Sequence, residues 1–413
     1  QMARTRVRPV TRGRALAFAA TTLAATLGLA TGLTSPAWAD PSRGDGPHHP
    51  FLAQLQNPSV VASTVPAAST PPQPGDGDVN PYGVAVVPRS EGRLVGGDVL
   101  VSNFNDAANE QGTGRTIVEV SPQGSVSVFA RIPDLPGGVG LTTALAVLPD
   151  GFVVVGNLPT SDGTSATARP GGLLILDQNG NLVDNMTGGD INGPWDLAAE
   201  NFGPFSVLYF TNVLNGTVAA MGTTVNQGTV VRLVLDFRRG APQVLSNTVI
   251  ASGFAERTDP DALVVGPTGV ALGRGGTLYV ADSVNSAIRA IPEAPFRMTS
   301  AGTGDLVSSG GALNDPLGLT VARNGDIVTV NGGDGLAVET TPNGNQVATK
   351  VLDSSGSPPG SGALFGLAIA PFGGLYFVDD ATNQLDLAPT LHPSDRPGHS
   401  DGPGSSDGSE GDG

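Results

Sequence analysis

The sequence predicts an all-β protein and, within that class, a six-bladed β-propeller whose blades are four-stranded antiparallel sheets. Three observations support this prediction. A short apolar strand recurs six times, each time followed closely by a second strand that ends in Asn or Asp. Asn-Gly and Asp-Gly pairs, which tolerate the positive φ of a tight hairpin, separate the apolar runs. Beyond the N-terminal segment, no window has a helical period.

The six repeats give the order of the blades along the chain. Later repeats recur about every 50 residues, which is the length of one blade, and the longer early spacings require inserted loops. The first strands begin near Pro81, Thr143, Pro194, Pro267, Pro316 and Leu364. The fifth unit contains all four strands of its blade, predicted at Gly318–Ala322, Asp326–Asn331, Gly335–Thr340 and Gln346–Leu352.

Four inserted segments are predicted to be loops on the face where the second strands end. Long loops clustered on one face of a rigid scaffold are a common place for binding, although they are also tolerated as decoration. These predicted loops are Asn105–Gly114, Leu158–Pro170, Val218–Gln227 and Phe254–Gly266. A fifth insertion, Glu293–Gly304, is predicted on the opposite face.

The last blade lacks its outer strand before the chain changes composition near Pro389. The β-prone run Ser59–Val65 precedes the first unit, and we expect it to pair beside Asn383–Ala388 and complete that blade. The propeller domain is therefore predicted to span residues 59–390, with residues 59–65 as its closing strand.

The N-terminal 39 residues are predicted to be a signal peptide. Five arginines precede an apolar run from Ala15 to about Leu33, and Ala37-Trp38-Ala39 supplies a small-residue cleavage pattern. A transmembrane anchor is the alternative, because the apolar run approaches spanning length. We expect cleavage before Asp40 and a secreted, extracellular bacterial protein that uses the general secretory route.

Segments at both ends of the propeller are predicted to lie outside its core. Residues 40–58 form a polar, Pro- and Gly-rich leader, and residues 391–413 form a disordered acidic tail. The net charge of −16 argues against nucleic acid and anionic membranes as partners. We expect a monomer whose partner is a protein, a glycan or a small molecule.

The residue types that are missing limit the chemistry. The chain has no cysteine, which removes thiolate nucleophiles and zinc–thiolate sites. All four histidines, His48, His49, His392 and His399, lie outside the repeats, so the repeat domain has no imidazole base or metal ligand.

Side chains at strand ends are the candidate binding residues. The second strands end in Asn103, Asn157, Asn212, Asp282, Asn331 and Asp379, and aromatic residues open three first strands at Tyr82, Trp195 and Phe365. Because these ends meet at one face, we expect them around the mouth of the central channel. The alternatives are that the amides and carboxylates cap their own loops and that the aromatics are core.

The fourth and sixth units carry a family resemblance. Gly269-Val270-Ala271, followed by Leu278-Tyr279-Val280-Ala281-Asp282-Ser283-Val284-Asn285, resembles the NHL repeat, and Leu375–Asp379 is a second copy. The resemblance covers about residues 80–388. It implies a six-bladed propeller that binds proteins, RNA or small ligands, with a few enzymes among its members.

The third unit resembles a second family. Gly193-Pro194-Trp195-Asp196-Leu197-Ala198, followed by Leu208–Asn212, is similar to a segment of the senescence-marker/gluconolactonase family. That resemblance implies a six-bladed, metal-dependent lactone hydrolase. Oxygen ligands alone suit Ca²⁺, and the aspartates expected at the channel mouth, Asp196 and Asp282, are its candidate ligands. Trp195 stands where the family has a metal-binding Asn, and Asn212 stands where it has an Asp.

Three functions follow as hypotheses. The leading one is a secreted, non-catalytic propeller that binds a protein, glycan or small ligand at the channel face that carries the loops and the ten candidate residues. The alternative is a Ca²⁺-dependent lactonase, or another hydrolase or lyase of sugar-derived substrates. A third is a surface-display module spaced from the cell by its acidic tail.

Overall fold

A computed structural model describes residues 49–390 of the chain. The predicted signal peptide, residues 40–48 of the predicted leader and the predicted acidic tail lie outside these residues, so the predictions for them stay untested. Within the described part, the helical segments are five short 3₁₀ turns, and all other regular structure is β-strand. The 3₁₀ turns are η1 (Leu52–Gln54), η2 (Pro149–Gly151), η3 (Ser165–Thr167), η4 (Arg274–Gly276) and η5 (Ser283–Asn285).

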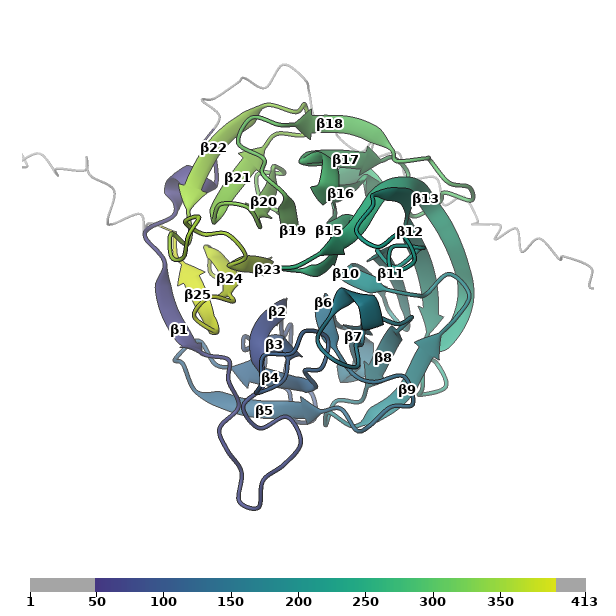
Figure 1. Cartoon of the computed structure of the whole chain (residues 1–413), viewed down its shortest axis with the longest axis vertical. Helices are drawn as coiled ribbons and strands as arrows, with labels where there is room; N and C mark the ends of the chain where they lie inside the picture. Colours follow the sequence, from purple (N-terminus) through teal and green to yellow (C-terminus); the bar gives the residue numbers. More distant parts are fainter. Residues whose placement is uncertain (1–48, 391–413) are drawn as a thin grey trace, which may run out of the picture. The chain divides into compact units, whose positions relative to one another are not determined.

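Six antiparallel sheets are arranged as a closed ring around a central channel (Figure 1). The innermost strand of each sheet contacts the innermost strands of its two neighbours, and the contact between β23 and β2 completes the ring. The prediction of a six-bladed propeller is therefore confirmed. The innermost strands are β2 (Val79–Val86), β6 (Leu141–Val147), β10 (Pro194–Phe202), β15 (Pro267–Leu272), β19 (Pro316–Val321) and β23 (Leu364–Ile369).

In blades 1 to 5 the strands follow one another outwards in chain order. Blades 1 and 2 add β3 (Val99–Asn105), β4 (Thr116–Val120), β5 (Val126–Arg131), β7 (Val153–Asn157), β8 (Gly172–Leu176) and β9 (Leu182–Thr187). Blade 3 adds β11 (Phe205–Asn212), β12 (Val225–Asp236), β13 (Gln243–Asp259) and β14 (Leu263–Val265). Blades 4 and 5 add β16 (Leu278–Asp282), β17 (Ala287–Ile291), β18 (Asp305–Ser309), β20 (Ile327–Asn331), β21 (Leu336–Thr340) and β22 (Gln346–Val351).

Blade 6 contains both ends of the described chain. Its strands are β23, β24 (Leu375–Asp379) and β25 (Gln384–Ala388), and β1 (Ser59–Ser63) is the outer fourth strand. β1 pairs antiparallel with β25, with Ser59 opposite Leu387 and Ser63 opposite Gln384. This is the closure expected from the sequence, and it covers an edge that would otherwise remain unpaired.

The segment before β1 is fixed to the seam between blades 5 and 6. The carboxylate of Glu339 on β21 accepts hydrogen bonds from the backbone N–H groups of Phe51 and Leu52, both at 2.7 Å. Phe51, Leu52 and Leu55 are buried in a cluster that includes residues of both blades. The chain is therefore attached to the propeller before it enters the closing strand.

Blade 3 departs from the four-stranded pattern. The predicted loop Phe254–Gly266 is instead the end of the long strand β13 and a hairpin to β14, in which Arg257 pairs with Val265 and Asp259 with Leu263. The loop prediction is wrong because apolar residues at Ala262–Val265 bury themselves against the ring and carry a strand with them. We call Asp259–Val265 the blade-3 hairpin.

Glycine allows the innermost strands to lie close together. Gly269, Gly318 and Gly366 occupy the same position of their repeats, and a Cβ on any of them would collide with the backbone of the next innermost strand. Because glycine has no Cβ, adjacent innermost strands can pack closely at the centre. Further out, apolar residues of facing sheets fill the space between blades. Among residues 49–390, no helix is long and apolar enough to cross a membrane.

Candidate functional site

The two ends of the central channel differ. We call the end where the innermost strands begin the start face, and the end where they finish the end face. At the start face, four aromatic rings form a layer across the channel. The ring centroid of Tyr82 lies 3.9 Å from that of Phe365, 4.4 Å from that of Phe104 and 6.3 Å from that of Trp195. All four side chains are buried, so this layer seals the channel.

The blade-3 hairpin covers the aromatic layer. The indole Nε1 of Trp195 donates a hydrogen bond to the carbonyl oxygen of Val264 at 3.1 Å. From blade 1, the side-chain amide of Gln111 donates to the carbonyl oxygen of Pro260 at 2.7 Å. The hairpin thus starts in blade 3 and is held by a loop from blade 1.

The three predicted Asn residues of blades 1 to 3 are buried and hold loops. Asn103 donates from Nδ2 to the carbonyl oxygen of Thr64 at 3.0 Å. The Oδ1 of Asn157 accepts from the backbone N–H of Gly140 at 2.7 Å. Asn212 donates from Nδ2 to a carbonyl oxygen of the preceding loop, at Asp190, at 2.7 Å.

The three corresponding residues of blades 4 to 6 behave in the same way. Asp282 accepts from Asn285 at 2.9 Å and from Arg289 at 3.2 Å. Asn331 donates to the carbonyl oxygen of Ala312 at 2.8 Å. Asp379 accepts from the backbone N–H of Thr382 at 3.2 Å.

The structure therefore brings nine of the ten predicted residues to the start face but buries them there. The exception is Asp196, which lies one residue further along its strand and faces the channel. The strand-end amides and carboxylates are held by their own loops, and Trp195 is bonded to the blade-3 hairpin. Their part in binding stays a prediction. The buried nine are Tyr82, Asn103, Asn157, Trp195, Asn212, Asp282, Asn331, Phe365 and Asp379.

Carboxyl groups gather beneath and beside the hairpin. Burial raises the pKa of Glu256 on β13 to about 8. Burial, together with the charge of Asp379, raises the pKa of Asp380 to about 7. The pKa of Asp315 rises to about 6 through burial and the charges of Asp259 and Asp261. Ionisation of Asp315 therefore makes its contact with the hairpin residues Asp259 and Asp261 less favourable.

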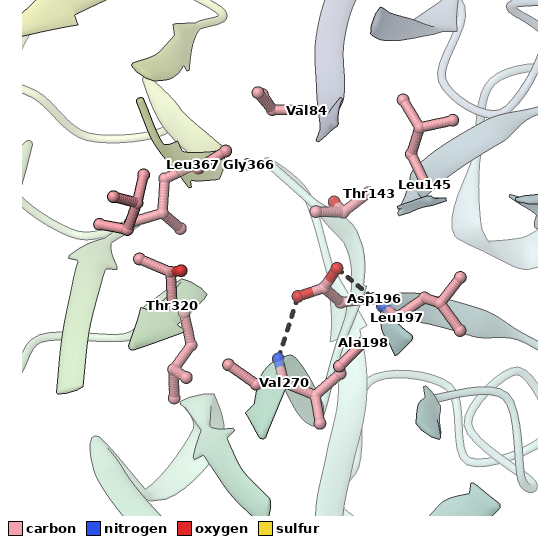
Figure 2. A pocket seen from close by; sticks show the side chains of 14 residues that line it. Val84, Thr143, Leu145, Asp196, Leu197, Ala198, Val270, Thr320, Gly366 and Leu367 are labelled. Carbon is pink, nitrogen blue, oxygen red and sulfur yellow. Dashed lines mark hydrogen bonds between the residues drawn. The ribbon is translucent and has the colours of Figure 1, made fainter. Parts of the chain in front are cut away.

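A cavity of about 210 Å³ occupies the channel below the aromatic layer (Figure 2). We call it the channel well. Its walls are residues of the six innermost strands. In β15, β19 and β23 the first four residues are buried and the last two are half-buried. Solvent therefore reaches the well from the end face. Its lining is Val84, Thr143, Leu145, Asp196, Leu197, Ala198, Val270, Ala271, Leu319, Thr320, Gly366, Leu367, Ala368 and Ile369.

Asp196 is the one ionisable side chain of this lining. Figure 2 shows its carboxylate directed toward the middle of the ring of innermost strands. One oxygen accepts from the backbone N–H of Leu197 at 2.7 Å, and the other accepts from that of Val270, on the next blade, at 3.0 Å. These two bonds fix the orientation of the carboxylate.

Burial raises the pKa of Asp196 from 3.8 to about 7, although the N–H groups of Val270 and Leu197 favour its charged form. The dominant cause is desolvation among apolar walls. The carboxyl group thus changes its charge near neutral pH, where a bound ligand can shift its protonation equilibrium.

The repeat makes Asp196 unusual. Strand pairing aligns the six blades with one another. In each blade, one residue of the innermost strand lies opposite the residue two positions before the strand-end Asn or Asp of the second strand, and the residue just before it in the innermost strand is the equivalent position. That position holds Gly83, Ala144, Asp196, Gly269, Gly318 and Gly366 in blades 1 to 6. A carboxylate therefore stands where the other blades have glycine or alanine.

Calcium does not fit the residues of the well. Ca²⁺ prefers six to eight oxygen ligands, whereas Asp196 is the only carboxylate of the lining and both its oxygens already accept N–H groups. In blade 4, Asp282 is neutralised by Arg289. Among the described residues, no group of three or more His, Asp or Glu side chains could hold a metal ion.

Two hydroxyls of the well were not predicted from the sequence. Thr143 has a buried Oγ1 without a hydrogen-bond partner, and Thr320 lies on the wall contributed by blade 5. Thr143 is part of an extra-residue bulge between Leu141 and Leu145, which turns it toward the channel. A sequence signal for the well itself exists at Asp196, because alignment of the repeats places this carboxylate where four other blades have glycine.

Comparison with known proteins finds solved structures that are similar to this chain in fold. No protein-family profile matches the chain, and no curated protein matches it significantly. A gluconolactonase from Xanthomonas campestris is 16% identical over 85% of this chain and 99% of its own, with a TM-score of 0.48. The calcium-binding protein regucalcin from Agrobacterium tumefaciens is 16% identical over 76% of this chain and 90% of its own, also at 0.48.

A streptogramin B lyase structure is 14% identical over 75% of this chain and 93% of its own, with a TM-score of 0.46. At these identities, the likeness concerns the fold and leaves the activity of this chain open.

Proposed function

We propose that the protein is a secreted, non-catalytic binding propeller that holds a small ligand in the channel well. The observation that carries the proposal is a solvent-reached cavity, walled by all the innermost strands, with a single oriented carboxylate at Asp196. Concave apolar sites with a few fixed polar groups are the usual form of small-molecule sites.

The well is a preorganised site. Its walls are strands locked by inter-blade packing, and the Asp196 carboxylate is held by two backbone N–H groups. Binding therefore requires little ordering of the protein, which lowers its entropic cost. At about 210 Å³ the well is smaller than most drug-sized sites, so we expect a compact ligand.

This site differs from the one expected at the start face. The aromatic layer and the blade-3 hairpin close that face, whereas the channel well is reached from the end face. Asp196 is the predicted residue that the two sites share.

A Ca²⁺-dependent lactonase is the alternative function. The mismatch between calcium and the residues of the well is the reason that we place it second. Gluconolactone hydrolysis, measured with CaCl₂ and with EDTA, tests it directly. Calcium-dependent turnover that disappears in Asp196→Ala would overturn the non-catalytic proposal.

The binding proposal is tested by filling the well. Ala368→Phe places a ring in the lining, and Ala241→Phe, on the exposed β12–β13 turn, is the matched control. A fragment library is screened by ligand-observed NMR against both variants and the wild type. We expect fragments that bind the wild type and Ala241→Phe but not Ala368→Phe. A screen without any such fragment contradicts the proposal.

A further inference from the structure

The charge of the channel well indicates what it binds, and this inference rests on the proposed function. Asp196 is surrounded in the well by valine, leucine, isoleucine, alanine, glycine and threonine. The strands packed against it contribute Thr143 from β6, Val270 from β15 and Leu367 from β23, none of which is charged. Its ionised form therefore has no countercharge from the protein in the well.

The fold does not require this carboxylate. Four other blades bring their innermost strands together through glycine at the equivalent position, and one does so through Ala144. A buried carboxylate without a cation is costly, because desolvation disfavours its charged form. Asp196 thus lowers the stability of the empty protein without being needed for the blade contact.

A second polar group of the well also lacks a partner. The Oγ1 of Thr143 is buried and makes no hydrogen bond within the protein. Rotation about the Cα–Cβ bond of Thr143 would turn this hydroxyl into the well, where it can accept a hydrogen bond from a ligand that also reaches Asp196; Figure 2 shows the two side chains beside each other. The well therefore offers a negative charge and a neutral acceptor, both surrounded by apolar walls.

We propose that the channel well binds a small organic cation, a primary or secondary amine that carries a compact apolar group. The ammonium group would pair with the Asp196 carboxylate and donate a second hydrogen bond to Thr143. The apolar group would lie against the leucine, valine and alanine walls. A carboxylate ligand would be repelled by Asp196, and a polyol would leave most of its hydroxyls unpaired.

Three probes of similar shape separate these possibilities: benzylamine, benzyl alcohol and benzoate. Their affinities are measured by ligand-observed NMR with the wild-type protein at about pH 8. We expect benzylamine to bind at least about tenfold more tightly than benzyl alcohol, and benzoate not to bind. We also expect the benzylamine affinity to fall as the pH is lowered below about 7, because Asp196 then takes up a proton.

Variants assign the effect to Asp196. In Asp196→Asn, benzylamine should bind no more tightly than benzyl alcohol, whereas Asp184→Asn, an exposed control on β9, should behave as the wild type. Asp196→Gly, which restores the residue of the other blades, repeats the test if the amide variant folds poorly. Preference for the amine that persists in these variants overturns the inference.

The two proposals can fail separately. If benzylamine and benzyl alcohol bind equally and Ala368→Phe blocks both, the well is a ligand site but the amine inference is wrong. If Ala368→Phe blocks neither probe, the well is not the site and both proposals fail.

Discussion

At the scale of single residues, equivalent positions of the repeat hold side chains of opposite charge in different blades. In blade 4, Arg289 lies opposite Val280 and pairs with Asp282. In blade 6, Asp386 has the same place opposite Phe377, and its neighbour is Asp379. Burial and the charges of Asp379 and Asp353 raise the pKa of Asp386 to about 6. One blade is held by an ion pair where the other contains two acids.

This contrast predicts opposite effects of mutation in the two blades. Arg289→Ala leaves the buried carboxylate of Asp282 unpaired, so we expect a loss of about 2 kcal/mol, less than for a fully buried pair because Arg289 is partly exposed. Asp386→Asn should stabilise the protein at about pH 8 by roughly 1 kcal/mol, since the raised pKa means that ionisation opposes folding. Urea unfolding measures both.

The gain from Asp386→Asn should vanish at about pH 3.5, where the wild-type carboxyl is protonated in the folded and unfolded states. A gain that is equal at both pH values would contradict the electrostatic explanation.

Asp196 predicts its own pH dependence. Its folded pKa of about 7 exceeds the ordinary value of 3.8, so the stability it contributes is complete below 3.8 and is lost as the pH rises through 7. Relative to Asp196→Gly, the wild type should lose about 1–2 kcal/mol between about pH 5 and pH 8, less than the full shift implies because solvent reaches the well. Urea unfolding of both proteins at the two pH values measures this difference.

At the scale of elements, the blade-3 hairpin determines what the start face exposes. Trp195 and Trp38 are the two tryptophans of the sequence, and Trp38 belongs to the predicted signal peptide. Fluorescence of the mature protein would then report on Trp195 alone, which lies under the hairpin.

Shortening the hairpin should expose this indole. Replacing Asp259–Leu263 by two glycines removes the cover, so we expect red-shifted emission and increased acrylamide quenching relative to the wild type. Quenching of the wild type should also increase from about pH 5 to pH 8, because ionisation of Asp315 is opposed by Asp259 and Asp261. Equal protection of Trp195 in both proteins would show that the hairpin is not its cover.

At the scale of the whole molecule, the ring is held closed by β1. Deleting residues 59–65 removes the outer strand of blade 6 and the contact between Asn103 and Thr64. We expect this deletion to lower Tm strongly by calorimetry, because β25 becomes an open edge. Deleting residues 391–413 is the control and should leave Tm unchanged. Similar Tm values for the two deletions would refute the role of β1.

The fold could be predicted from the sequence because each blade repeats the same pattern of an apolar strand followed by a strand that ends in Asn or Asp. The strand ends and the missing outer strand of blade 6 follow from local patterns and counting. The channel well could not be predicted, because a cavity depends on side-chain volumes contributed by six strands distant in sequence. The burial of the strand-end side chains by their own loops and the blade-3 hairpin over Trp195 could not be predicted, because both depend on tertiary packing, which in the hairpin overrides a loop-like sequence.

The pairing of β1 with β25 also has a consequence in time. During synthesis, Ser59–Ser63 emerges more than 300 residues before its partner Gln384–Ala388. Until then, no growing chain can close the ring, however many blades it already contains. Ring closure must therefore follow the synthesis of the last blade, and it joins the first strand of the propeller to the last one.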